Sequence, residues 1–108
     1  MRKLALQARV EWKFCRDSAS GYWVAVCEPL KQTVSAETWV ELNESIAETL
    51  NLLFHELLDK DELESFLRDH GWKFQQPIPE RSGNVRFDVP WKLVERRGAY
   101  AREEAVCR

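Results

Sequence analysis

Apolar and polar residues alternate over the first part of the chain. The apolar positions are Leu4, Leu6, Ala8, Val10, Trp12 and Phe14. A period of two residues predicts a strand over 4–14 with one buried face. The turn-forming residues 17–21 are followed by a run over 22–27 that is apolar on both faces, which predicts a hairpin. Residues 33–36 predict a short third strand.

The pattern then changes to the period of a helix. Thr38 and Glu41 have the spacing of a capping box, so we expect the Thr38 hydroxyl to accept from the Glu41 amide and the Glu41 carboxylate to reach the Thr38 amide. A helix over about 39–58 is predicted, with an apolar stripe of Leu42, Ile46, Leu50, Leu53 and Leu57. Glu41, Glu44, Glu48 and Asn51 are expected to face away from this stripe.

The last third of the chain predicts one short helix and one more strand. The helix begins near Asp61 and ends before Gly71. A proline-containing loop over 75–84 leads to a strand that starts at Val85, in which Pro90 indicates an edge or a bulge.

These elements predict an α+β fold. A small, mainly antiparallel sheet in the order strand, strand, strand, helix, helix, strand is packed by one long helix. One domain over 1–98 and a polar C-terminal tail over 99–108 are expected.

Composition adds the broad class. The chain has 108 residues, of which 44% are hydrophobic and 31% charged, as in folded soluble domains. No apolar run approaches the roughly 20 residues that cross a bilayer, and the N-terminal apolar stretch stops at Gln7, so neither a membrane span nor an export signal is expected. Cys15, Cys27 and Cys107 are odd in number and lack C-x-x-C spacing, which predicts no disulfide framework and no zinc knuckle. A reducing cytoplasm is the expected location.

Charge is distributed unevenly. Residues 1–40 carry +2 (six basic, four acidic), 41–70 carry −7 (two, nine) and 71–108 carry +3 (eight, five), which sum to −2. An array of carboxylates suits a basic partner that normally holds RNA. Glu41, Glu44 and Glu48 are therefore the candidate partner-binding residues.

No catalytic machinery is visible in the sequence. His55 has Asp59 four residues later, which predicts a surface ion pair, and His70 is expected to cap the end of its helix. A weak metal-dependent nuclease would need Glu11 to converge with the helix glutamates. We therefore predict no catalytic residue, no metal, no cofactor and no enzyme activity.

The chain resembles the HicB-like antitoxin family. The resemblance lies in 21–30 (GYWVAVCEPL), 33–42 (TVSAETWVEL) and Ile46-Ala47, with a weaker match at Pro77-Ile78-Pro79. It implies a partial RNase H-like fold that binds and blocks a small basic toxin, one that degrades messenger RNA. Lys31-Gln32 stands where many members have a Pro-Gly corner. No helix-turn-helix or ribbon-helix-helix unit is recognised after Gly98, so DNA binding is not expected.

Three functional hypotheses follow, of which the weak metal-dependent nuclease is the least favoured. The first is a cytoplasmic, non-enzymatic, homodimeric antitoxin-like protein that neutralises a small basic RNA-cleaving toxin. The alternative is an orphan oligomerisation or small-ligand-binding module without a toxin partner. For the dimer we expect contacts from Phe87, Trp91 and Leu93, because an edge strand with this much apolar surface needs a cover.

Overall fold

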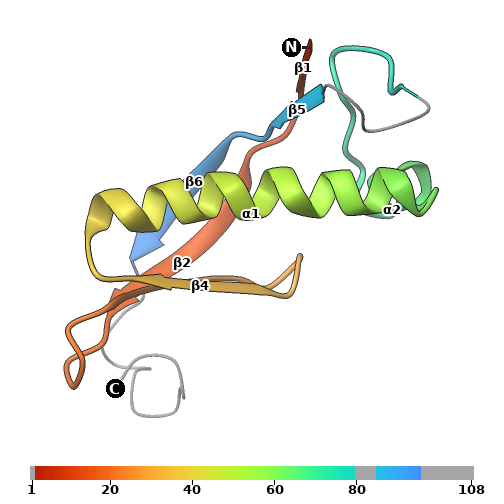
Figure 1. The fold of residues 1–108 in the computed structure, drawn as a ribbon. Coiled ribbons are helices and arrows are strands. Elements are labelled where there is room, and N and C mark those ends of the chain that lie inside the picture. Colours follow the sequence, from red (N-terminus) through yellow and green to blue (C-terminus); the bar gives the residue numbers. More distant parts are fainter. Residues whose placement is uncertain (1, 80–84, 96–108) are drawn as a thin grey trace. The chain divides into compact units, whose positions relative to one another are not determined.

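The computed structural model describes residues 2–79 and 85–95. It contains two helices and six strands, shown in Figure 1: β1 (Arg2–Ala5), β2 (Val10–Arg16), β3 (Trp23–Cys27), β4 (Gln32–Ala36), α1 (Trp39–Asp59), α2 (Leu63–His70), β5 (Val85–Asp88) and β6 (Trp91–Glu95). The predicted α+β class is confirmed. The predicted boundaries of the long helix and of the strands over 22–27 and 33–36 agree with α1, β3 and β4 to within one residue.

The strands form two sheets rather than one. Four strands lie in the order β4-β3-β2-β6, and β1 pairs with β5 alone. The β2–β3 and β3–β4 pairs are antiparallel, as the predicted hairpin requires, whereas β1–β5 and β2–β6 are parallel. The prediction of one mainly antiparallel sheet is therefore wrong.

The predicted strands over 4–14 and from Val85 are each divided in two. Pro90 has no N–H to donate, so the parallel ladder stops at this position. Ala5 pairs with Asp88 and Val10 with Trp91, which leaves four residues between β1 and β2 but only two between β5 and β6. The two extra residues between β1 and β2 cannot pair with the other strand, so residues 7–9 leave the ladder. The alternation of apolar and polar residues nevertheless continues through them. The element order consequently has eight members instead of the six predicted.

The chain divides into two compact units, each built from separate segments. Of the described residues, 10–46 and 91–95 form one, which we call the sheet unit, and 2–9, 47–79 and 85–90 form the other, the aromatic unit. Neither unit is a continuous stretch of chain: α1 is divided between them, β1 and β5 belong to the aromatic unit, and β2 and β6 belong to the sheet unit. The single domain over 1–98 stays a prediction, and the predicted tail over 99–108 lies outside the described residues.

The sheet unit has its buried apolar residues on β2, β3 and the first turns of α1. Trp12, Ala25, Cys27, Leu42 and Ile46 have no exposed surface. At the helix start, the Glu41 amide donates to Thr38 Oγ1 at 3.1 Å, which confirms half of the predicted capping box. The other half differs: the Glu41 carboxylate accepts the Thr38 hydroxyl proton at 3.0 Å instead of the Thr38 amide.

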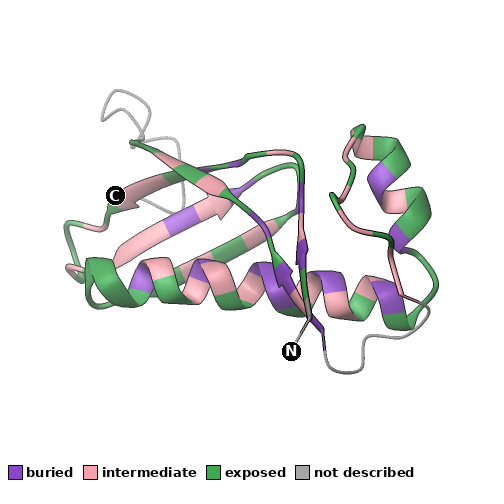
Figure 2. Ribbon diagram, turned by 90° about the horizontal axis from the view of Figure 1, so that it is seen from above, coloured by how far each residue is buried: buried purple, intermediate pink, exposed green. Residues whose placement is uncertain are grey.

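The aromatic unit is centred on Phe54. Its ring lies 5.7–5.8 Å from the rings of Phe66, Phe74 and Phe87. Buried residues recur along α1 in Figure 2, and in this unit they are Leu50, Asn51, Phe54 and Leu58. The predicted stripe is wrong here, because Leu53 and Leu57 are only half-buried. Asn51, expected to face away, is also buried.

Local rules hold well around α2. Gly71 has φ 70° and its amide donates to the Arg68 carbonyl, while the Trp72 amide donates to the Leu67 carbonyl. This is the glycine-terminated helix end that was predicted. His70 Nδ1 donates to the Phe66 carbonyl at 2.9 Å, which places it in the last turn as expected. His55 is half-buried with its ring edge-on to Phe87, 5.0 Å away.

Cys27 and Cys15 differ in state. Cys27 is a buried free thiol, and burial raises its pKa. Cys15 is disulfide-bonded, so the prediction of no disulfide is wrong for this residue; the number and spacing of cysteines along a sequence do not show which of them meet in the fold. Cys107 lies outside the described residues. Among the described helices, none is long and apolar enough to cross a membrane.

Candidate protein-binding surface

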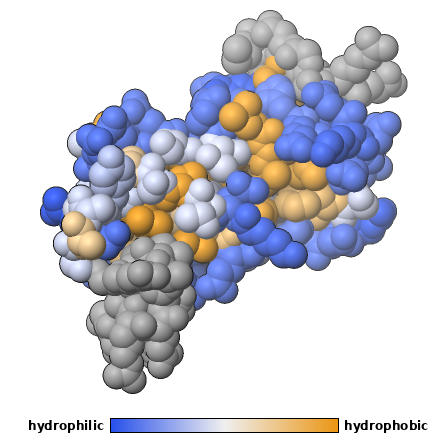
Figure 3. Space-filling view, turned by 60° about the horizontal axis from the view of Figure 1, so that its bottom comes forward, coloured by the Kyte–Doolittle hydropathy of each residue, from blue (hydrophilic) through white to orange (hydrophobic). Residues whose placement is uncertain are grey.

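Few large apolar side chains are exposed, and several of them gather in the sheet unit. Most of the face drawn in Figure 3 is hydrophilic, interspersed with apolar areas. In the sheet unit, Val40 is 65% exposed, Tyr22 40% and Trp39 39%. Contiguous exposed apolar surface can mark a site of interaction, and Tyr and Trp are enriched among the residues that dominate binding energy.

Trp39 is held in place by its neighbours. Its ring lies 4.9 Å from Phe14 and 5.0 Å from Trp23, in both cases edge-on. The Arg16 guanidinium lies 5.5 Å from the centre of the Trp23 ring, and its Nε donates to the Gly21 carbonyl. Trp39 therefore packs against two other aromatic rings, and the cluster already accommodates one guanidinium group over an aromatic face.

Tyr22 is positioned by the hairpin turn and by strand register. Gly21 has φ 79°, a conformation that side-chain-bearing residues rarely adopt, and the Asp17 amide donates to the Tyr22 carbonyl at 2.8 Å. Because Trp23 pairs with Ala36, the preceding residue Tyr22 lies beside Glu37. The Tyr22 hydroxyl donates to the Glu37 carboxylate at 2.9 Å.

Three carboxylates lie on the same two segments as these apolar groups, Glu37 beside Tyr22 and Glu41 and Glu44 on the first turns of α1. Glu37, Glu41 and Glu44 are exposed, and within the described part of the chain none of the three forms an ion pair with a Lys, Arg or His. The hydrogen bond to Glu37 raises the pKa of Tyr22, and the charges of Glu37 and Glu41 raise it further. The phenol thus lies in a negative field. We call this set of side chains the acidic–aromatic surface: Tyr22, Glu37, Trp39, Val40, Glu41 and Glu44.

Helix stability alone does not explain the acidity of α1. The helix carries five acidic residues and neither Lys nor Arg in 21 residues, and its last turn has no basic residue. Negative charge favours the first turn of a helix, where Glu41 also serves the cap, but it opposes the helix dipole in the last turn. Selection for stability would place cations near Glu56 and Asp59. Lys60, just beyond the helix, supplies one such charge by pairing with Glu56 at 2.7 Å.

The three predicted partner-binding glutamates are all exposed. Glu41 and Glu44 belong to the acidic–aromatic surface, and Glu48 follows one turn later on α1, in the aromatic unit. The sequence prediction missed Tyr22, Glu37, Trp39 and Val40. Val40 does not belong to the apolar stripe predicted for the helix. This position outside the stripe is the feature of the sequence that could have identified Val40 as an exposed apolar residue.

The residues predicted for the dimer interface lie in different environments. Phe87 is 2% exposed and packs in the Phe54 cluster, so it offers no surface to a second copy, and the prediction is wrong for this residue. Trp91 and Leu93 are half-buried on β6, an edge strand of the four-stranded sheet. Val94, between them and the end of β6, is 38% exposed.

The predicted alternative of a metal-dependent nuclease has no site in the described residues. Glu11, exposed on β2, lies 3.5 Å from the Lys92 ammonium in an ion pair. In residues 2–79 and 85–95 no group of three or more His, Cys, Asp or Glu side chains is arranged to hold a metal ion.

Comparison of the chain with protein families, with characterised proteins and with solved structures found no match. The chemistry of the acidic–aromatic surface therefore carries the functional argument.

Proposed function

We propose that the protein is a non-enzymatic binding module that docks a small basic protein on the acidic–aromatic surface. The observation that carries this proposal is the exposure of Tyr22, Trp39 and Val40 among three carboxylates that have no cationic partner in the described residues. Lys and Arg side chains combine an apolar stem with a cationic head. The stem can pack on the exposed apolar and aromatic side chains of this surface while the head pairs with its carboxylates. Tyr and Trp are also the residues that most often dominate binding energy.

The proposed partner is a small basic RNA-cleaving toxin, which makes the protein antitoxin-like. A protein that cleaves RNA presents cations to phosphates, and an array of carboxylates can occupy that cationic site. The resemblance of residues 21–42 to HicB-like antitoxins supports the same partner. A partial RNase H-like fold and the absence of DNA binding belong to this proposal. The cytoplasmic location predicted from the cysteine pattern is not favoured by the disulfide bond of Cys15, because disulfides are rare in a reducing cytoplasm.

We propose further that the protein forms a homodimer through the edge of β6. An edge strand has unpaired N–H and C=O groups, and β6 adds the apolar surface of Trp91, Leu93 and Val94. Replacing Trp91 and Leu93 by Ser should yield a folded monomer in analytical ultracentrifugation. Leu52→Ser, which removes an exposed leucine from α1, should leave the dimer intact. A dimer that persists in the double variant would place the interface elsewhere.

Inhibition of RNA cleavage tests the proposed function. The proposal predicts that the adjacent gene encodes a small basic protein that cleaves messenger RNA and that an equimolar amount of this chain stops the cleavage. The double variant Glu37→Gln/Glu41→Gln should inhibit less, whereas Asp61→Asn/Glu62→Gln, with the same loss of charge on exposed residues outside this surface, should inhibit fully.

Two results would contradict the proposal. If the adjacent protein cleaves RNA equally with and without this chain, the protein is an orphan module instead. If this chain itself cleaves RNA in the presence of Mg²⁺ and loses the activity in Glu11→Gln, it is a nuclease.

A further inference from the structure

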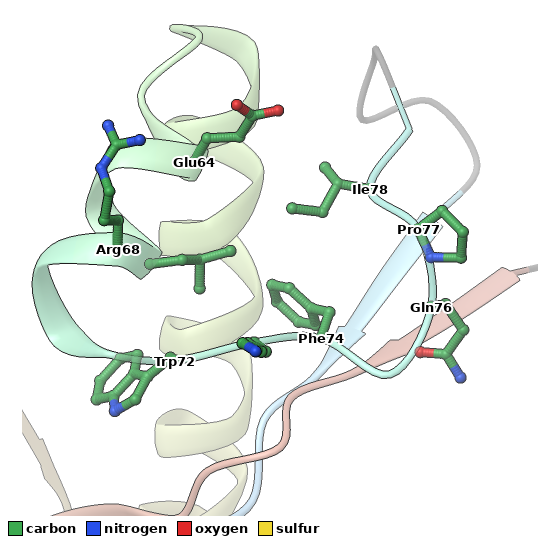
Figure 4. Close-up of a pocket in the computed structure, with 9 residues that line it drawn as sticks. Glu64, Arg68, Trp72, Phe74, Gln76, Pro77 and Ile78 are labelled. Atoms are coloured by element: carbon green, nitrogen blue, oxygen red, sulfur yellow. The ribbon is translucent and has the colours of Figure 1, made fainter.

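A second surface feature, unrelated to the acidic–aromatic surface, lies in the aromatic unit. An open groove of about 420 Å³ runs between α2 and the segment that follows it. Figure 4 shows Glu64 and Arg68 on the α2 side, Pro77 and Ile78 on the opposite side, and Phe74 between them. This volume falls within the roughly 300–1,000 Å³ typical of small-molecule sites.

The wall of the groove opposite α2 is fixed in place by backbone hydrogen bonds. The Gln75 amide donates to the Ala5 carbonyl at 2.8 Å, and the Gln7 amide donates to the Lys73 carbonyl at 2.7 Å. The Gln76 side chain also accepts from the Ala5 amide at 2.8 Å. The wall is therefore anchored to the strand segment beside it, so a ligand would find the groove already formed.

The groove has an apolar base. Leu67 is buried, and Phe74 and Ile78 are half-buried. Phe74 belongs to the Phe54 cluster, with ring centres 5.7 Å apart, so the base of the groove is the outer side of the apolar core. An apolar ligand body placed here would remove additional apolar surface from water without a change in the core.

Cations exceed anions along the groove. Arg68 and Lys73 line it and are exposed, and neither forms an ion pair with an Asp or Glu in the described residues. Glu64 is the single acidic residue among the lining residues, so the groove carries +1 (two cations, one carboxylate) in a chain whose net charge is −2. This local excess of positive charge favours an anionic ligand.

We infer that the groove binds a small carboxylate with an apolar body. The carboxylate pairs with Arg68 and Lys73, for which Arg offers two parallel N–H donors. The apolar body lies against Leu67, Phe74 and Ile78. This inference does not depend on the proposed protein partner, because every residue of the groove belongs to the aromatic unit.

Titration of the full-length protein with octanoate, followed by two-dimensional NMR of the backbone amides, tests the inference. We expect octanoate to shift the amides of residues 64–78 and to bind about tenfold more tightly than octan-1-ol, which has the same apolar chain without the charge. Octylammonium, with the opposite charge, should bind more weakly than the alcohol.

Two double variants assign the contribution of the cations. Arg68→Gln/Lys73→Gln should bring octanoate affinity down to that of octan-1-ol. Lys60→Gln/Lys92→Gln removes the same charge from exposed residues that do not line the groove and should leave octanoate affinity within about twofold.

The apolar contact is tested separately by Ile78→Asn, which should weaken octanoate and octan-1-ol alike. Equal affinity for the acid and the alcohol would overturn the inference. So would shifts confined to other parts of the chain, or no shift at millimolar octanoate.

Discussion

Replacing Asn51 by alanine tests the buried hydrogen bond between α1 and β5. Asn51 is 9% exposed, and its Oδ1 accepts the amide proton of Phe87 at 2.8 Å. Among the strands in the described part of the chain, β5 pairs with β1 and with no other. The Asn51 side chain therefore takes the hydrogen-bonding position that a further strand would fill beside β5.

The magnitude follows from two opposing effects. Removing the acceptor leaves a buried N–H without a partner, which costs about 1–3 kcal/mol. Alanine also forms helix more readily than asparagine, which returns about 0.5 kcal/mol. Asn51→Ala should therefore lower the free energy of unfolding by about 0.5–2.5 kcal/mol, a large share of the roughly 5–15 kcal/mol typical of small domains.

Asn43→Ala is the matched control, because the same substitution occurs on the same helix. Asn43 Nδ2 donates to the Trp39 carbonyl at 2.9 Å in an exposed position, so water can replace it and only the gain in helix propensity remains. Urea denaturation monitored by tryptophan fluorescence gives both free energies. Amide exchange of Phe87 should also accelerate in Asn51→Ala. If the two variants have equal stability, or if Phe87 exchange is unchanged, the proposed role of Asn51 is refuted.

Three further predictions concern helix packing, capping and the acidic–aromatic surface. Leu50→Ala should lower the free energy of unfolding by about 2–5 kcal/mol, whereas Leu52→Ala, at a position that is 57% exposed, should change it by less than about 0.5 kcal/mol in the same urea experiment. Thr38→Ala should cost about 1 kcal/mol of thermal stability measured by circular dichroism, because the Glu41 amide loses its acceptor; a neutral result would show that this bond is unimportant. Glu37→Gln should lower the pKa of Tyr22 towards 10.0. In the parent protein the fold raises this pKa, so the Tyr22–Glu37 contact should persist below pH 10 and be lost as the pH rises through the raised pKa. NMR titration of the tyrosine ring measures this change, and an unaltered pKa would contradict the assigned cause.

Features set by neighbouring residues could be predicted from the sequence. The capping contact of Thr38 with the Glu41 amide depends on residues three apart, and the helix end at Gly71 depends on one residue that tolerates positive φ. Both follow from local geometry. The strands over 22–27 and 33–36 were also predictable, because β-branched and aromatic residues between turn residues favour extended backbone.

Features set by distant residues could not be predicted. Asn51 is polar and was assigned to the exposed face, but β5 needs an acceptor at a position 36 residues away along the chain. The effect of Pro90 was foreseen for its own strand only. The break in the first predicted strand at residues 7–9 depends on the parallel pairing of β1 with β5 and of β2 with β6. The periodicity of apolar residues does not reveal that pairing.

The candidate surface shows the same limit. Glu41 and Glu44 were identified from charge, because a helix pattern places them on one face. Tyr22 and Glu37 are 15 residues apart and meet only through the β3–β4 register. Two of the three glutamates of the surface could therefore be predicted from the sequence, whereas Glu37 and the aromatic residues could not.

The most direct test of the central claim is the affinity of this chain for the small basic protein encoded beside it, measured by isothermal titration calorimetry. Glu37→Gln/Glu41→Gln/Glu44→Gln should weaken binding by at least about tenfold, and Tyr22→Ala by a similar factor. The charge-matched control Asp61→Asn/Glu62→Gln/Asp69→Asn, on exposed residues of the aromatic unit, should stay within about twofold. An equal loss in both triple variants, or no complex with the parent chain, would contradict the assignment of the acidic–aromatic surface as the binding site.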